Sequence, residues 1–248
     1  ANLISEIKIS ECIFHETGKN DNDETDGGGN VIGIGIHTKN GAVDPNDERI
    51  ECYIENCIFN FTSAAVSCYT EEITFTGNIL YKCGRSAFRV SRRKQSEHGF
   101  ILENNTFSES NTGIMINSWD VGLKHQPSIK NNTFDDIFAP GGNSESDQSE
   151  YGFRFTISGD VPIVLDNNTF HNIRTVKGGF GGDFAQTLTG ENEYKDFNLT
   201  FINCYFEENR QAVEGDGGAF RMIENQCNNG NIYLTFRGCH FNNNEAVD

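Results

Sequence analysis

The chain has 248 residues, 19 of them basic and 36 acidic, so its formal net charge at pH 7 is −17. This charge argues against nucleic acid and anionic membrane surfaces as partners, because both are bound by basic patches. No apolar run in the sequence approaches the ~20 residues that cross a bilayer, and its first residues do not have the basic and apolar pattern of a leader. We expect no nucleic-acid partner and no membrane span, and we interpret residues 1–248 as a single domain, a segment of a longer repeat protein.

One short pattern recurs along the whole chain: an apolar residue, polar residues, Asn or Cys, any residue, and then an anchor residue that is nearly always Phe. Its copies are 9–14, 54–59, 75–80, 102–107, 129–134, 165–170, 201–206 and 236–241. The anchors are Phe14, Phe59, Leu80, Phe107, Phe134, Phe170, Phe206 and Phe241. Such self-similarity is typical of stacked repeats.

The positions before the anchor form columns with a physical meaning. Three residues before it, Asn or Gly dominates, which indicates a bend with positive φ. Two residues before it stand Cys12, Cys57, Asn78, Asn105, Asn132, Asn168, Cys204 and Cys239. We expect these side chains to turn inward, where stacked asparagines form an amide ladder beside a column of stacked anchor rings.

The repeat also predicts short strands. An apolar-x-apolar run precedes each bend, and a second run follows several anchors, as in 87–90, 113–116 and 152–155. The spacing between anchors varies from 21 to 45 residues, which a solenoid permits because insertions leave at the turns. We therefore predict an all-β, right-handed parallel β-helix of about eight or more coils. A β-sandwich or propeller is the alternative.

The last part of the chain adds a resemblance. Phe206–Asn209 (FEEN), Gly217–Phe220 (GGAF) and Phe241–Asn244 (FNNN) resemble the FxxN and GGA repeats of the polymorphic outer membrane protein family. The resemblance implies a right-handed β-helix at a cell surface with a role in adhesion. Earlier copies keep the Phe but lose its Asn, and these motifs are scaffold residues, so the resemblance speaks to fold more than to activity.

Cysteines and sequons favour a secretory route. The chain has eight cysteines and the N-glycosylation sequons at Asn60, Asn104, Asn131, Asn167 and Asn198. Three sequons are the repeat's own Asn-Asn-Thr, which turn geometry alone could require. Cys12 with Cys57, and Cys204 with Cys239, are disulfide candidates; the alternative is reduced, buried thiols in place of Asn. A degenerate coil around residues 31–37 would separate the first pair.

Two charged segments are candidate sites. Asp21, Asp23 and Asp26 are candidate Ca²⁺ ligands, but their spacing is not that of an EF-hand, and we prefer to interpret them as a solvated turn insertion. Another candidate is the basic patch Arg89, Arg92, Arg93 and Lys94, which could hold an anionic sugar or an acidic chain. We interpret Asp135 and Asp136 as turn residues.

These observations predict a non-catalytic extracellular rod with a structural or adhesive role and no required cofactor. Its expected partners are proteins or glycans at a cell surface, and self-association into filaments is a further expectation. The alternative is a carbohydrate-active β-helix enzyme of the polysaccharide lyase or glycoside hydrolase type, because lyases of this fold abstract a proton with Arg or Lys near Ca²⁺. The Asp cluster that such enzymes place on neighbouring coils is not evident in the sequence.

Overall fold

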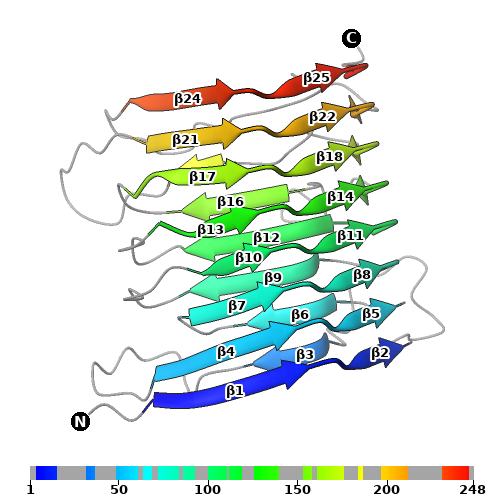
Figure 1. The fold of residues 1–248 in the computed structure, drawn as a ribbon, viewed down its shortest axis with the longest axis vertical. Coiled ribbons are helices and arrows are strands. Elements are labelled where there is room, and N and C mark those ends of the chain that lie inside the picture. The colour runs from blue at the N-terminus through cyan, green and yellow to red at the C-terminus, as the bar shows by residue number, and fades with distance from the viewer. Residues whose placement is uncertain are drawn as a thin grey trace, which may run out of the picture.

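The computed structural model describes residues 4–15, 32–36, 49–60, 64–68, 72–83, 86–92, 100–110, 112–118, 126–139, 153–157, 161–175, 184–186, 197–211 and 231–245. These segments form four parallel sheets that run along one axis (Figure 1).

The strands of each sheet are hydrogen-bonded in the order given. Sheet A contains β1 (Ile4–Ser10), β4 (Arg49–Glu55), β7 (Glu72–Thr76), β10 (Ile101–Glu103), β13 (Ser128–Lys130), β17 (Ile163–Asp166), β21 (Phe197–Ile202) and β24 (Ile232–Arg237). Sheet B contains β2 (Ile13–His15), β5 (Ile58–Asn60), β8 (Ile79–Tyr81), β11 (Thr106–Ser108), β14 (Thr133–Asp135), β18 (Thr169–His171), β22 (Tyr205–Glu207) and β25 (His240–Asn242). Sheet C contains β20 (Phe184–Gln186), β16 (Phe153–Ile157), β12 (Thr112–Ser118), β9 (Ser86–Arg92), β6 (Ala64–Cys68) and β3 (Ile32–Ile36). Sheet D contains β15 (Phe138–Ala139), β19 (Arg174–Thr175) and β23 (Arg210–Gln211).

Each repeat supplies one strand to sheet A and the next to sheet B, and in the first six repeats the chain then returns through sheet C. All strand pairs among the described residues are parallel, and anchors pair with anchors: Phe107 with Phe134, Phe134 with Phe170, and Phe170 with Phe206. The architecture is a parallel β-helix, as the repeat predicts. Because β2 pairs directly with β5 and residues 32–36 form β3 of sheet C, no hidden coil separates the first two repeats.

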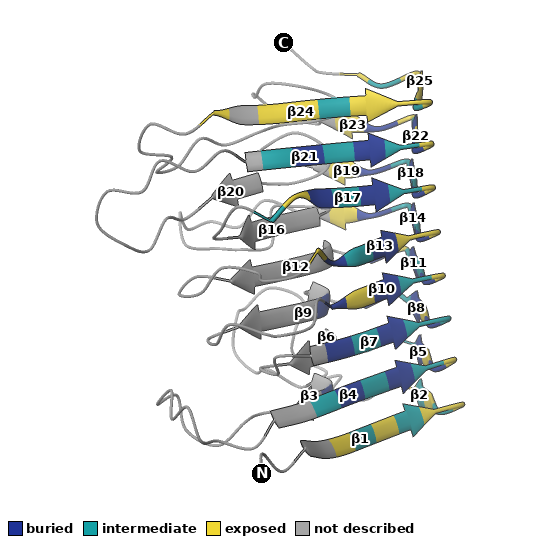
Figure 2. Ribbon diagram, turned by 60° about the vertical axis from the view of Figure 1, so that its left-hand side comes forward, coloured by how far each residue is buried: buried dark blue, intermediate teal, exposed yellow. Residues whose placement is uncertain are grey.

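Alternating burial along sheets A and B defines the core (Figure 2). In β4, Cys52 and Ile54 are buried, whereas Glu51, Tyr53 and Glu55 are partly exposed. The anchor rings stack along the axis, with Phe107 and Phe170 centred 4.9 Å and 5.0 Å from Phe134. At the last coil the inward positions are open, and Phe241 is 47% exposed.

The buried asparagines form the expected amide ladder. Asn132 donates from Nδ2 to the Leu102 carbonyl at 2.8 Å and to Oδ1 of Asn168 at 2.9 Å. Its own Oδ1 accepts from the backbone and side-chain amides of Asn105. Asn78 and Asn105 repeat this pattern. These buried amides thereby satisfy one another and the backbone of neighbouring coils without charge.

The bend before the ladder lies in the left-handed region in all eight repeats. The residues with positive φ there are Glu11, Asn56, Gly77, Asn104, Asn131, Asn167, Asn203 and Gly238. Gly77 and Gly238 also leave room for a neighbour, because a Cβ on Gly77 would come within 2.4 Å of Oδ1 of Asn56. This column was predicted from its Asn and Gly content.

The disulfide prediction is wrong in this structure: Cys12, Cys57, Cys204 and Cys239 are free thiols. Each occupies the ladder position of Asn. Sγ of Cys204 lies 3.4 Å from the Leu165 carbonyl, the equivalent of the carbonyl that receives the Asn132 amide. Cys57 and Cys239 face the corresponding carbonyls of Ile9 and Phe201. The alternative of buried thiols replacing Asn is therefore confirmed for Cys57 and Cys204, whereas Cys12 and Cys239 are partly exposed.

Candidate functional site

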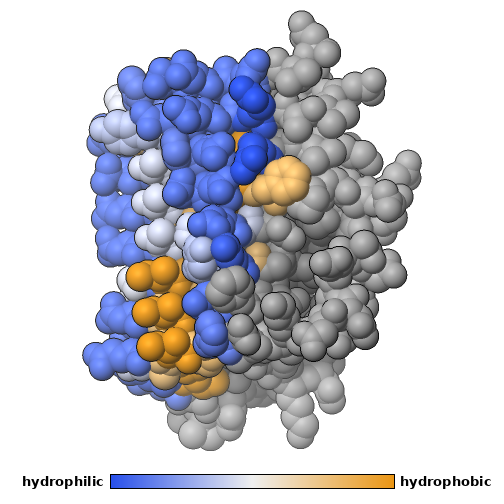
Figure 3. Space-filling model, turned by 90° about the vertical axis from the view of Figure 1, so that its right-hand side faces the viewer, coloured by the Kyte–Doolittle hydropathy of each residue, from blue (hydrophilic) through white to orange (hydrophobic). Residues whose placement is uncertain are grey.

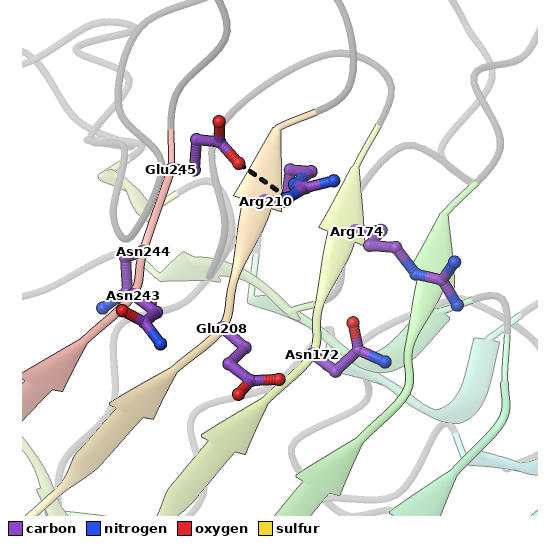
Figure 4. A pocket seen from close by; sticks show the side chains of 7 residues that line it. All are labelled: Asn172, Arg174, Glu208, Arg210, Asn243, Asn244 and Glu245. Carbon is purple, nitrogen blue, oxygen red and sulfur yellow. Dashed lines mark ion pairs between the residues drawn. The ribbon is translucent and has the colours of Figure 1, made fainter.

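A polar cleft of about 570 Å³ lies at the corner between sheets B and D, near the C-terminal end of the rod. Its lining comes from three successive coils, and Figure 4 shows these side chains. They are Asn172, Arg174, Glu208, Arg210, Asn243, Asn244 and Glu245. The cleft thus presents amides, guanidinium groups and carboxylates together.

A second corner of the backbone positions this cleft. Two residues after the anchor the chain again adopts positive φ, with values from 47° to 54° at Lys82, Glu109, Asp136, Asn172, Glu208 and Asn243. A second, shorter amide ladder holds the corner from inside: Asn209 donates to the Phe170 carbonyl at 3.0 Å and to Oδ1 of Asn244 at 2.8 Å. Asn209 and Asn244 are the asparagines of the two FxxN motifs, which therefore act as scaffold.

Both arginines of the cleft are engaged by carboxylates. The Arg174 guanidinium lies 2.5 Å from Oδ1 of Asp136 and also lies over the Phe138 ring, 5.6 Å from its centroid. The Arg210 guanidinium lies 2.8 Å from Oε2 of Glu245. Asn172 donates to the same Asp136 oxygen at 3.1 Å. These pairs are partly exposed, so they orient the side chains more than they stabilise the fold.

His171 connects the cleft to the outer face of sheet B. Its Nδ1 lies 2.6 Å from Oδ1 of Asp135 on the preceding coil, and its Nε2 lies 3.6 Å from Oε2 of Glu208. The hydrogen bond to Asp135, helped by the charges of Asp135, Glu208 and Glu207, raises the pKa of His171 above its usual value. The imidazole is thus flanked by two carboxylates, which favour its protonated form.

The outer face of sheet B changes character along the rod. One residue before the anchor, the N-terminal coils carry the exposed isoleucines Ile13, Ile58 and Ile79, which form the apolar patch in Figure 3. The same column continues as Thr106, Thr133 and Thr169. The polar cleft and the apolar patch therefore lie toward opposite ends of the molecule.

The predicted charged sites fall outside the part of the chain whose side chains the structure describes. Asp21, Asp23 and Asp26 lie outside the described residues, as do Arg93 and Lys94. Arg89 and Arg92 lie on β9, but the positions of their side chains also fall outside. In the described part of the chain, no group of three or more His, Cys, Asp and Glu side chains could hold a metal ion. Within the same residues, no helix could span a membrane.

The sequon asparagines of the repeat have a structural role. Asn104, Asn131 and Asn167 are exposed and occupy the first bend. Nδ2 of Asn131 donates to Oδ1 of Asn104 at 3.1 Å, and Nδ2 of Asn167 donates to Oδ1 of Asn131 at 2.9 Å. Turn geometry and this outer ladder thus explain the Asn at these positions. Asn60 ends β5, and Asn198 lies on β21.

Sequence reasoning missed the corner cleft and the partner of Asp135. Asp136 occupies a bend, as expected, and also holds Arg174, whereas Asp135 ends strand β14 and faces His171. The signal was present in the alignment on the anchor, because Asp135 and His171 both follow it by one residue and stacked repeats place equivalent positions side by side.

Comparison with known proteins agrees with this architecture. The family model described as a right-handed beta helix region matches residues 2–195. No curated protein and no solved structure matches the chain. With most of the chain covered by that model, and with the parallel sheets described above, the chain belongs to the right-handed β-helix family.

Proposed function

We propose that this β-helix is a non-catalytic extracellular rod that serves adhesion at a cell surface, with the corner cleft as its contact site for glycans. The observation that carries the proposal is the cleft itself: seven polar side chains from three coils, held by a satisfied inner ladder. Amide, guanidinium and carboxylate groups in fixed positions supply the donors and acceptors that sugar hydroxyls require.

Extracellular placement and membership among polymorphic outer membrane protein-like surface proteins are part of this proposal. Their support is the pair of FxxN motifs, whose asparagines build the inner ladder beside the cleft. Five sequons and a net charge of −17 are compatible with secretion and with a soluble surface.

The test is binding of the 248-residue chain to an immobilised panel of glycans, with Glu208→Gly as the cleft variant. Glycine suits the positive φ of 54° at this position, so the variant removes the carboxylate without straining the bend. We expect binding to weaken at least about tenfold, the value of one charged hydrogen bond.

The matched control is Glu109→Gly. Glu109 occupies the equivalent bend three coils earlier, with φ of 47°, and lies outside the cleft. Binding by this variant should equal that of the unmodified chain. If the unmodified chain binds no glycan of the panel, or if both variants lose binding equally, adhesion through the cleft is refuted.

The cluster of His171, Asp135 and Glu208 favours one second candidate, a carbohydrate-active enzyme. A protonated imidazole beside carboxylates can act as a general acid toward a glycosidic oxygen. Incubation of the same glycans with the protein, followed by assay of new reducing ends, distinguishes the two functions. Cleavage that disappears in His171→Gln would support the enzyme and overturn the proposal of a non-catalytic rod.

A further inference from the structure

The arginines of the corner cleft carry an inference about ligand class, which rests on the proposed function. Arg174 is paired with Asp136 and Arg210 with Glu245, at 2.5 Å and 2.8 Å. Both partners stand on coils adjacent to the arginine they hold, Asp136 one coil before Arg174 and Glu245 one coil after Arg210. The guanidinium groups of the cleft are therefore already paired with the protein's own carboxylates.

An acidic ligand would compete with these carboxylates for the guanidinium groups. A tethered carboxylate competes at a high effective concentration, because it is already held in place by the fold. The incoming anion would also approach Glu208, whose contact in the described structure is His171 at 3.6 Å, on a chain with a net charge of −17. Repulsion from these charges adds to the cost.

A hydroxyl group of an uncharged ligand does not have to compete with these carboxylates. One hydroxyl can donate to a carboxylate oxygen and accept from a neighbouring amide or guanidinium at the same time. Glu208 offers acceptors, and Asn172 and Asn243 offer amides on the coils before and after it. Hydroxyls can therefore bind without breaking either ion pair.

The spacing of these groups suits a chain of sugars. Asn172, Glu208 and Asn243 occupy the same bend on successive coils, so they repeat every ~4.8 Å along the axis. This rise is close to the length of one pyranose ring in a linear polysaccharide. We propose that the cleft binds an uncharged, hydroxyl-rich glycan aligned with the rod axis and discriminates against the acidic form of the same glycan.

The test uses pairs of oligosaccharides that share a backbone and differ in charge. Suitable pairs are fully methyl-esterified and de-esterified galacturonan hexamers, and cellohexaose and its form oxidised to the uronate at C6. Equilibrium affinities are measured by calorimetry with the full chain. We expect the uncharged member of a pair to bind at least about tenfold more tightly than the acidic member.

Glu245→Gln supplies the decisive variant. It releases Arg210 from its carboxylate, so the preference for the uncharged member should fall at least about tenfold as Arg210 becomes available to a uronate. Glu109→Gln is the matched control, since it removes the same charge from an exposed pair with Lys82 at 3.3 Å, outside the cleft.

The outcomes separate the two proposals. Tighter binding of the acidic members by the unmodified chain, or an equal shift in Glu245→Gln and Glu109→Gln, overturns this inference and leaves glycan adhesion intact. Failure of every hexamer and every glycan of the panel to bind overturns both.

Discussion

Asn132 shows how a single buried side chain joins coils of the rod. It is 1% exposed, donates to Leu102 and Asn168, and accepts from the backbone and side chain of Asn105. An amide suits this position because it carries donors and an acceptor on one short group. Any apolar replacement leaves buried groups on neighbouring coils without partners.

Replacement of Asn132 should therefore be costly. We expect Asn132→Ala to lower the free energy of unfolding by at least about 3 kcal/mol, because several buried groups lose their hydrogen bonds at about 1–3 kcal/mol each. Urea denaturation measures the change. Asn131→Gly, which removes the adjacent exposed amide and suits its φ of 55°, should cost less than about 1 kcal/mol. Equal losses in the two variants would contradict a ladder that is buried and cooperative.

The ladder cysteines lead to a prediction about thiol chemistry. Burial raises the pKa of Cys204 to about 11, so its sulfur remains a thiol at neutral pH and reacts slowly in the folded chain. We expect alkylation of denatured protein without reductant to label Cys12, Cys57, Cys204 and Cys239, as read by peptide mass spectrometry. Recovery of a Cys12–Cys57 or Cys204–Cys239 cross-linked peptide would contradict the free thiols of the structure.

At the scale of elements, the pairing of β14 with β18 brings an acid and a base together. Asp135 and His171 are partners in the parallel register, although they belong to different repeats. The raised pKa of His171 means that the protonated form is favoured in the folded chain. Its contribution to stability is therefore full below the unfolded pKa, about 6.5, and disappears as pH rises through the folded pKa.

This linkage predicts a difference between two pH profiles. The free energy of unfolding of the unmodified chain minus that of His171→Gln should be greatest near pH 6 and should shrink toward pH 8.5. Denaturation at several pH values between these limits measures it. Asp135→Asn should lower the pKa of His171, which NMR titration of the imidazole can follow. Parallel profiles for the unmodified chain and His171→Gln would contradict the pairing.

At the scale of the whole molecule, stability is distributed along one axis. Among the described residues, each strand pairs with the equivalent strands of the adjacent coils, so inner coils are covered on both sides and the last described coil on one. Phe134 is fully buried between Phe107 and Phe170, whereas Phe241 stacks on Phe206 at 4.7 Å and is 47% exposed. Identical rings in one column thus have different surroundings.

The same substitution should give different results at these two positions. Phe134→Ala should destabilise the fold by about 3–5 kcal/mol, the range for a fully buried aromatic residue. Phe241→Ala should cost roughly 1–2 kcal/mol, because nearly half of its side chain is already in water. Urea denaturation followed by circular dichroism compares them. Equal costs would contradict nearest-neighbour stacking.

Much of this arrangement follows from the sequence by itself. The coil is determined by three repeated positions: the anchor, the Asn or Cys two residues before it, and the Asn or Gly at the bend. These residues can satisfy their hydrogen bonds and pack well only when successive copies of the repeat stack on one another. The inward ladder, the stacked rings and the first positive-φ corner were therefore predictable residue by residue.

The tertiary structure alone decided the second corner, the state of the cysteines and the site. The positive φ of Glu109 and Glu208 could not be predicted from the residue type, because neither residue is Gly or Asn. Cysteine composition could not distinguish a disulfide from a thiol that replaces an amide, because both occupy stacked positions. The cleft unites side chains from coils about 35 residues apart, and its ion pairs depend on which exposed side chains the stacking places next to each other. Stacking is encoded in the inward columns, whereas the outward side chains that it brings together vary from coil to coil.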